Sequence, residues 1–177
     1  IPWARLYHQL TYEEGVAAFS MTNTVERSKR FKLIPIPYKA KISIMVKSDK
    51  KEQLMKKNLE DLSIAVVRED IGHHLLNLHD IPSTQVHTTS PHSMLKMLLH
   101  DRVDAIAYAE EVVRFQFEKL ALDAGDIASF YTLEDNKVNS YIFHRNTDKC
   151  VISLFSNVIN TLQERGELDA VIARYVL

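Results

Sequence analysis

The sequence predicts an α/β protein with mostly parallel strands, and two observations lead to this prediction. First, strand-like apolar runs alternate with helical segments along most of the 177 residues, which is typical of α/β folds. Second, two breaks flank a segment in the middle of the chain, the proline-rich PIPYKAK at 35–41 and the polar LEDNKVNS at 133–140. These breaks predict one domain inserted into another, with both crossings acting as a hinge.

Five runs have the length and composition of β-strands, since each is short, apolar or alternating, and bounded by polar residues. They are GVAAFSM (15–21), KISIMVK (41–47), LSIAVVR (62–68), RVDAIAYA (102–109) and NSYIFHR (139–145).

A helix is predicted where SPHSMLKMLLHD follows the third strand, because Ser90 is a favourable N-cap and Pro91 fits the first helical position. Its apolar side chains fall on one face and predict packing against a sheet; they are Met94, Leu95, Leu98 and Leu99.

A longer helix is predicted over residues 148–164, because apolar residues recur with helical spacing and Gly166 follows as a stop. The apolar positions are Val151, Leu154, Phe155, Val158, Ile159 and Leu162. A second, short helix is predicted over residues 167–177.

Composition excludes several classes of protein. The hydrophobic fraction of 46% and the formal net charge of −1 predict a globular chain without the basic field that nucleic acid requires. The single cysteine, Cys150, excludes an intrachain disulfide and is expected to be a small buried apolar residue. No apolar run reaches membrane-spanning length. The opening IPWARLYHQL has no methionine and is interpreted as a processed or trimmed start.

Motifs of common catalytic and metal sites are missing from the sequence. HExxH, GxSxG, GxGxxG and a phosphate-binding loop do not occur. His73 and His74 are adjacent and face different sides of a helix, so together with His79 they do not predict a metal site. We therefore expect no metal, no cofactor and no catalytic residue.

The order of several segments resembles the family 3 extracellular solute-binding proteins, the periplasmic receptors of amino-acid-type ABC importers. These segments are PWAR, EEGVAAFSMTNTVERSKRFKL, YKAKISIMVKSD, LEDLSIAVVRED, LKMLLHDRVDAIAYAEE and NVINTLQERGELDAVIARY. The resemblance covers nearly the whole chain, and the order of segments is more specific than any single motif.

The resemblance implies a type II periplasmic-binding-protein-like fold with parallel-rich sheets. Lobe I would comprise residues 1–40 and 138–177, and lobe II would comprise residues 41–137, inserted through two hinge strands. The family's first strand, helix and second strand have no counterpart in this sequence, so we expect a fragment or an unread N-terminus.

The resemblance also implies ligand-binding residues in lobe I. Amino-acid receptors of this family carry a Thr-x-Thr-x-x-Arg stretch, and Thr22, Thr24 and Arg27 keep its spacing. The arginine would bind the ligand carboxylate through two parallel hydrogen bonds, which lysine cannot do. Ser20 stands where a backbone contact is usual. The alternative for Arg27 is a solvated charge at the start of a helix.

The matching position in lobe II departs from the family. An aspartate that pairs with the ligand's α-ammonium is usual after the strand DAIAY, but this sequence has Ala109. Glu110 or Glu111 could substitute, the ligand could lack an α-ammonium, or both glutamates could simply favour the helix start.

The loop VREDIGHH matches the place where family members offer backbone N–H groups to the ligand, here at Ile71. Asp70 is the expected N-cap, and its charge favours a cationic or donor-rich group. Trp3 is expected to wall the pocket or to pack in a core. Tyr108 ends a strand, where ligands bind in parallel sheets, and its alternative is a structural hydroxyl.

These features predict a monomeric, non-enzymatic periplasmic receptor that traps a small amino-acid-like or carboxylate solute between two lobes for an ABC permease. The alternatives are the ligand-sensing domain of a signalling protein and a dehydratase-like enzyme that uses Glu110 or Glu111 near Tyr108.

Overall fold

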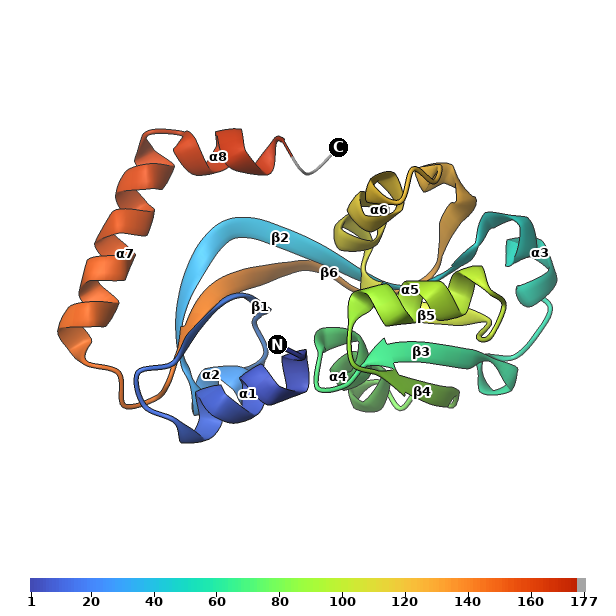
Figure 1. Ribbon diagram of the computed structural model, residues 1–177, viewed down its shortest axis with the longest axis horizontal. Coiled ribbons are helices and arrows are strands. Elements are labelled where there is room, and N and C mark those ends of the chain that lie inside the picture. The colour runs from blue at the N-terminus through green and yellow to red at the C-terminus, as the bar shows by residue number, and fades with distance from the viewer. Residues whose placement is uncertain (175–177) are drawn as a thin grey trace. The chain divides into compact units, whose positions relative to one another are not determined.

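The computed structural model describes residues 1–174, which fall into two compact units (Figure 1). Among the described residues, the first unit comprises Ile1, Arg5–Ala40 and residues 136–174. The second comprises Pro2–Ala4 and Lys41–Asp135. The start of the first helix, including Trp3, therefore belongs to the second unit and not to the first.

The first unit is built mainly from helices around two long strands and one short one. Its elements are α1 (Trp3–Tyr12) from Arg5 onward, β1 (Ala17–Thr22), α2 (Val25–Arg30), α7 (Lys149–Glu164), α8 (Glu167–Ile172), and parts of β2 (Lys32–Lys47) and β6 (Ile127–Phe143).

The second unit alternates strands with helices. Its elements are α3 (Lys51–Leu54), β3 (Ser63–Val67), α4 (Ile71–Leu78), β4 (Thr84–Thr88), α5 (Pro91–Leu99), β5 (Ala105–Ala109) and α6 (Glu110–Lys119). Short 3-10 turns occupy Ser48–Lys50, Leu59–Asp61 and Ala124–Asp126.

The strands form a single mixed six-stranded sheet in the order β1-β6-β2-β5-β3-β4. Only β3 is parallel to both of its neighbours, whereas β1 runs antiparallel to β6 and β2 runs antiparallel to β5. The α/β class is confirmed. One mixed sheet stands in place of the predicted parallel-rich sheets, because the long strands β2 and β6 pair antiparallel with β5 and β1 while β3 to β5 pair in parallel.

The two predicted breaks lie inside strands. β2 continues through the proline-rich stretch 35–41, and β6 continues through the polar stretch 133–140. In β2, Pro35 and Pro37 alternate, so both missing N–H donors fall on one edge of the strand and the other edge can still pair. In β6, Asn136 adopts a left-handed backbone with φ 57°, which asparagine tolerates well. The two strands therefore begin earlier than local composition predicts, at Lys32 and not at residue 41 for β2, and at Ile127 and not at residue 139 for β6.

The sequence does not predict the strand β4, because TQVHT has one strongly apolar residue and follows a proline and a serine. Its five residues pair in parallel with β3 over the whole length, from Ser63 opposite Thr84 to Val67 opposite Thr88. Pairing with the buried strand β3, and not the local composition, therefore explains why these residues form a strand.

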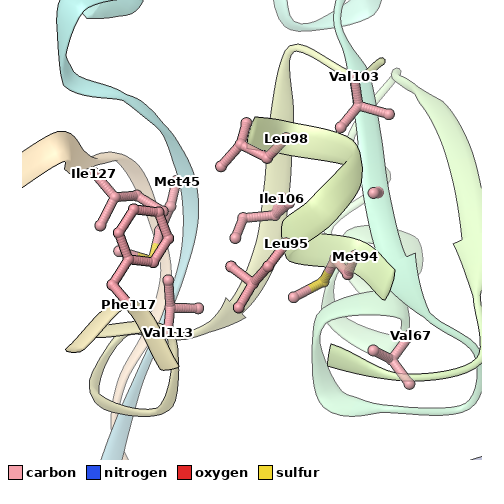
Figure 2. Close-up of a cluster of buried hydrophobic side chains, with 11 residues drawn as sticks. Met45, Val67, Met94, Leu95, Leu98, Val103, Ile106, Val113, Phe117 and Ile127 are labelled. Atoms are coloured by element: carbon pink, nitrogen blue, oxygen red, sulfur yellow. The ribbon is translucent and has the colours of Figure 1, made fainter. Parts of the chain in front are cut away.

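The core of the second unit lies where α5 and α6 meet the sheet. α5 begins as predicted, with the Ser90 side chain accepting from the backbone N of Ser93 and Pro91 in the first turn. Figure 2 shows its side chains directed toward the strands, with Phe117 of α6 beside Met45. The buried members are Met45, Ala65, Val67, Met94, Leu95, Leu98, Val103, Ile106, Val113, Phe117 and Ile127.

The helix α7 buries little of its apolar face. It begins after Asp148, whose side chain accepts from the backbone N of Cys150, and it ends before Gly166, which has a positive φ of 70° as expected for a helix stop. Ile159 is its only fully buried residue. The exposed apolar members are Val151, Leu154, Phe155 and Val158.

Cys150 lies in the first turn of α7 and is exposed, so the prediction that it is buried is wrong. The predicted last helix is found over Glu167–Ile172, and residues 175–177 of that prediction lie outside the described part of the chain. Within residues 1–174, no helix combines the length and hydropathy needed to cross a bilayer.

Candidate functional site

Arg27 lies buried at the end of β1, with 3% of its surface exposed. The Thr24 side chain caps α2 by accepting from the backbone N of Arg27 at 3.1 Å. The guanidinium Nη1 donates to the carbonyl of Thr22 at 2.9 Å, and Cζ lies 5.9 Å from the ring centroid of Tyr7. Arg27 is therefore not a solvated surface charge. A buried guanidinium remains charged and fits a carboxylate in two parallel hydrogen bonds.

The backbone next to this arginine is irregular. Ser20 is exposed and has a φ of 61°, a left-handed conformation that is unfavourable for serine. The register between β1 and β6 shifts between Ala18 and Met21, which identifies a bulge. A bulge redirects the strand end. Thr22 follows it, is buried, and lies opposite Asn139 of β6.

In the second unit, Asp70 and Tyr108 lie together. The Asp70 side chain accepts from the backbone N of Ile71 at 2.7 Å and so caps α4 as predicted. Burial raises the pKa of Tyr108 well above its ordinary value, and the charge of Asp70 and a hydrogen bond between the two side chains raise it further. The phenol is therefore protonated, and this pair combines a fixed negative charge with a hydroxyl.

Trp3 is fixed against the same loop. Its indole Nε1 donates to the carbonyl of Glu69 at 2.9 Å, and its ring packs against the core of the second unit. Three residues singled out from the sequence, Trp3, Asp70 and Tyr108, therefore converge on one loop. Ile71 is buried, and its N–H already donates to Asp70.

The helix α4 approaches the sheet closely at its first turn. A Cβ added to Gly72 would lie 2.0 Å from the carbonyl oxygen of Ala107 and 2.7 Å from its carbon. The backbone of β5 therefore touches the first turn of α4, and this contact places the Asp70 cap beside Tyr108.

Glu110 sits in a network of donors at the start of α6, and 8% of its surface is exposed. Oε1 accepts from Ser43 Oγ at 2.6 Å and lies 3.2 Å from Lys41 Nζ. Burial alone would raise the pKa of Glu110, but hydrogen bonds from Ser43, Ser129 and Lys41 together hold it below its usual value. An ionised glutamate of this kind is a poor general acid at neutral pH.

Glu111 is fixed separately, because its Oε1 accepts from the backbone N of Lys41 at 3.2 Å. Both glutamates occupy the first turn of α6, which was one of the three alternatives considered for them.

Sequence reasoning missed two contributors. Tyr7 supplies the aromatic face near Arg27, but nothing in the helix WARLYHQLTY marks it. Glu69 supplies the carbonyl that holds Trp3 and has a φ of 63°. Among residues 1–174 no group of three or more histidine, cysteine, aspartate or glutamate side chains is arranged to hold a metal ion.

Neither protein-family models nor curated protein sequences match this chain. Solved structures match closely in fold. The substrate-binding protein of an amino acid ABC transporter superposes with a TM-score of 0.81 at 17% identity, covering 99% of this chain and 77% of that one. The fold is that of amino-acid ABC transporter substrate-binding proteins. This confirms the fold that the resemblance implies.

Two further structures show how widely this fold is used. An amino acid ABC transporter substrate-binding protein from Streptococcus pneumoniae, bound to L-arginine, matches at 18% identity and a TM-score of 0.81, over 99% of this chain and 73% of that one. A histidine kinase sensor domain matches at 16% identity and a TM-score of 0.80, over 98% and 75%.

Proposed function

We propose that this protein is an extracytoplasmic receptor for a small amino-acid-like solute that carries a carboxylate. The observation that carries the proposal is the buried guanidinium of Arg27 beside the carbonyl of Thr22, at the end of a strand in a fold shared with amino-acid-binding proteins. A carboxylate is the ligand group that such an arginine binds most strongly.

The second unit would supply the complementary contacts. Asp70 offers negative charge to a cationic or donor-rich group, and the protonated hydroxyl of Tyr108 fixes its orientation. The position that would hold an aspartate is Ala109, so the carboxyl of Asp70 takes over the role of pairing with the solute's donor end. Trp3 limits the site through its contact with the Glu69 carbonyl.

In this proposal the solute is held by residues of both units and favours the closed form, which an ABC permease then recognises. Only a difference in solute affinity between open and closed forms is needed. The protein would act in the periplasm, as a monomer and without a cofactor.

The test is isothermal titration calorimetry with L-arginine, L-glutamine, putrescine and succinate. We expect a solute with a carboxylate and a donor end to bind, and Arg27→Lys to weaken it about 10- to 100-fold, because one or two charge-assisted hydrogen bonds are lost. Arg30→Lys is the matched control. Arg30 lies on the same helix, is half exposed and pairs with Glu26.

Circular dichroism of each variant separates loss of binding from loss of folding. If Arg27→Lys binds every solute as tightly as the parent protein, the carboxylate clamp is refuted. If putrescine binds best, the solute class is wrong even though the fold is shared.

A second function, the ligand-sensing domain of a signalling protein, is favoured by the similarity to a histidine kinase sensor domain. The size of the natural gene product, measured by immunoblot of the source cells, discriminates the two. A product joined to a kinase supports the sensor, whereas a product of receptor size supports the importer. In the dehydratase alternative, the lowered pKa of Glu110 argues against this residue as a general acid.

A further inference from the structure

His73 of α4 faces the loop that precedes its own helix. Its Nδ1 accepts a hydrogen bond from the backbone N of Glu69 at 3.3 Å. A ring nitrogen accepts only through a free lone pair, so this bond exists with the neutral imidazole and is lost when Nδ1 is protonated.

The backbone of Glu69 links this histidine to the proposed solute site. Its φ of 63° lies in the left-handed region, which is unfavourable for glutamate and must be held by its surroundings. The N–H of Glu69 goes to His73, the carbonyl accepts from Trp3, and the next residue is the Asp70 cap. A change at His73 would therefore reach both Trp3 and Asp70.

Charged and titratable groups face His73 from three elements. The ring of His87 on β4 lies 4.8 Å away, centroid to centroid, at an interplanar angle of 88°. Arg68 and Glu69 approach from the loop, and His74 from the same helix. Burial lowers the pKa of His73, and His87 lowers it further, while Glu69 opposes the shift.

We propose that His73 is an acid-sensitive latch on residues 68–70, the Glu69 loop. A proton taken from solvent by Nδ1 turns the acceptor into a donor, breaks the bond from Glu69 and releases the left-handed backbone. Trp3 and Asp70 then lose their fixed positions. The consequence for solute binding rests on the function proposed above, but the latch itself does not.

Trp3 is the only tryptophan, so the fluorescence of the intact protein without solute reports on the Glu69 loop. We expect its emission to shift to longer wavelength on acidification from pH 8 to pH 5, in one transition with a midpoint below the ordinary histidine value of about 6.5. His73→Gln should abolish the shift, because an uncharged amide oxygen can accept from Glu69 at every pH. His87→Gln should move the midpoint to higher pH.

His79→Gln is the matched control, because His79 follows the same helix and is exposed. It should leave the transition unchanged. The latch is overturned if the shift persists in His73→Gln, or if the emission stays constant while nitrogen NMR shows His73 gaining its proton.

A separate arm uses L-arginine as the probe. We expect its affinity to fall about three- to tenfold between pH 8 and pH 5 in the parent protein but not in His73→Gln, as the loss of one hydrogen bond predicts. If the emission behaves as expected but the affinity for every bound solute is independent of pH, the latch stands and the role of the Glu69 loop in solute binding is refuted.

Discussion

The close contact between α4 and β5 leads to a sharp prediction for Gly72→Ala. The added Cβ would lie 2.0 Å from the carbonyl oxygen of Ala107, about 1.4 Å short of the 3.4 Å at which ordinary contact begins. Backbone atoms on both sides must move because the clash is with a backbone carbonyl, so the cost of overpacking lies at the upper end of the usual range, about 3 kcal/mol or more. The better helix propensity of alanine offsets up to about 1 kcal/mol of this cost. We expect a net loss of about 2 kcal/mol or more in the free energy of unfolding.

Urea unfolding followed by circular dichroism measures this loss, and the thermal midpoint should fall by about 4 °C or more. Gly125→Ala is the control, because the nearest atom to its added Cβ is Oδ1 of Asp123 at 3.1 Å, the end of a flexible side chain. A Gly72→Ala protein within about 0.5 kcal/mol of the parent would refute the reasoning, since it would mean that α4 can move away from β5 freely.

Three further predictions concern single side chains. Glu110→Gln should lower stability by about 1–2 kcal/mol at pH 7. Because the folded state lowers the pKa of Glu110, its contribution is present above the ordinary glutamate pKa and disappears as the pH falls through the lowered value, so urea titrations of parent and variant should converge only at a pH below that ordinary pKa. Tyr108→Phe should cost about 1 kcal/mol in urea unfolding and weaken solute binding, because Asp70 loses its hydroxyl partner; equal affinity would contradict the proposed site. Ile159→Ala should cost about 2–4 kcal/mol, whereas Leu154→Ala, at a residue 62% exposed, should change the thermal midpoint little.

Local signals predicted the elements whose ends are decided by local chemistry. Ser90 and Pro91 mark the start of α5, and Asp70 marks the start of α4, because a cap satisfies backbone N–H groups of its own helix. β4 could not be found in this way, since its pairing with β3 across the sheet stabilises it and its own composition is unremarkable for a strand.

The site shows the same limit. The stretch VERSKR is equally typical of a solvated helix start, but in the structure Arg27 is buried, with the Tyr7 ring and the Thr22 carbonyl beside its guanidinium. These contacts join parts of the chain whose proximity no periodicity reveals. Likewise, Asp70 and Tyr108 were each singled out, but their hydrogen bond follows from the close packing of α4 on β5.

The two long strands β2 and β6 make the second unit an insertion that one continuous segment of the gene encodes almost completely. The second unit is almost entirely one uninterrupted stretch, Lys41–Asp135, and the chain enters it on β2 and leaves it on β6, which are neighbours in the sheet. The two points at which the chain passes between the units therefore lie on adjacent strands. Recombination that replaced this coding segment with another would exchange the second unit, while the parts of β2 and β6 in the first unit would keep their neighbours in the sheet.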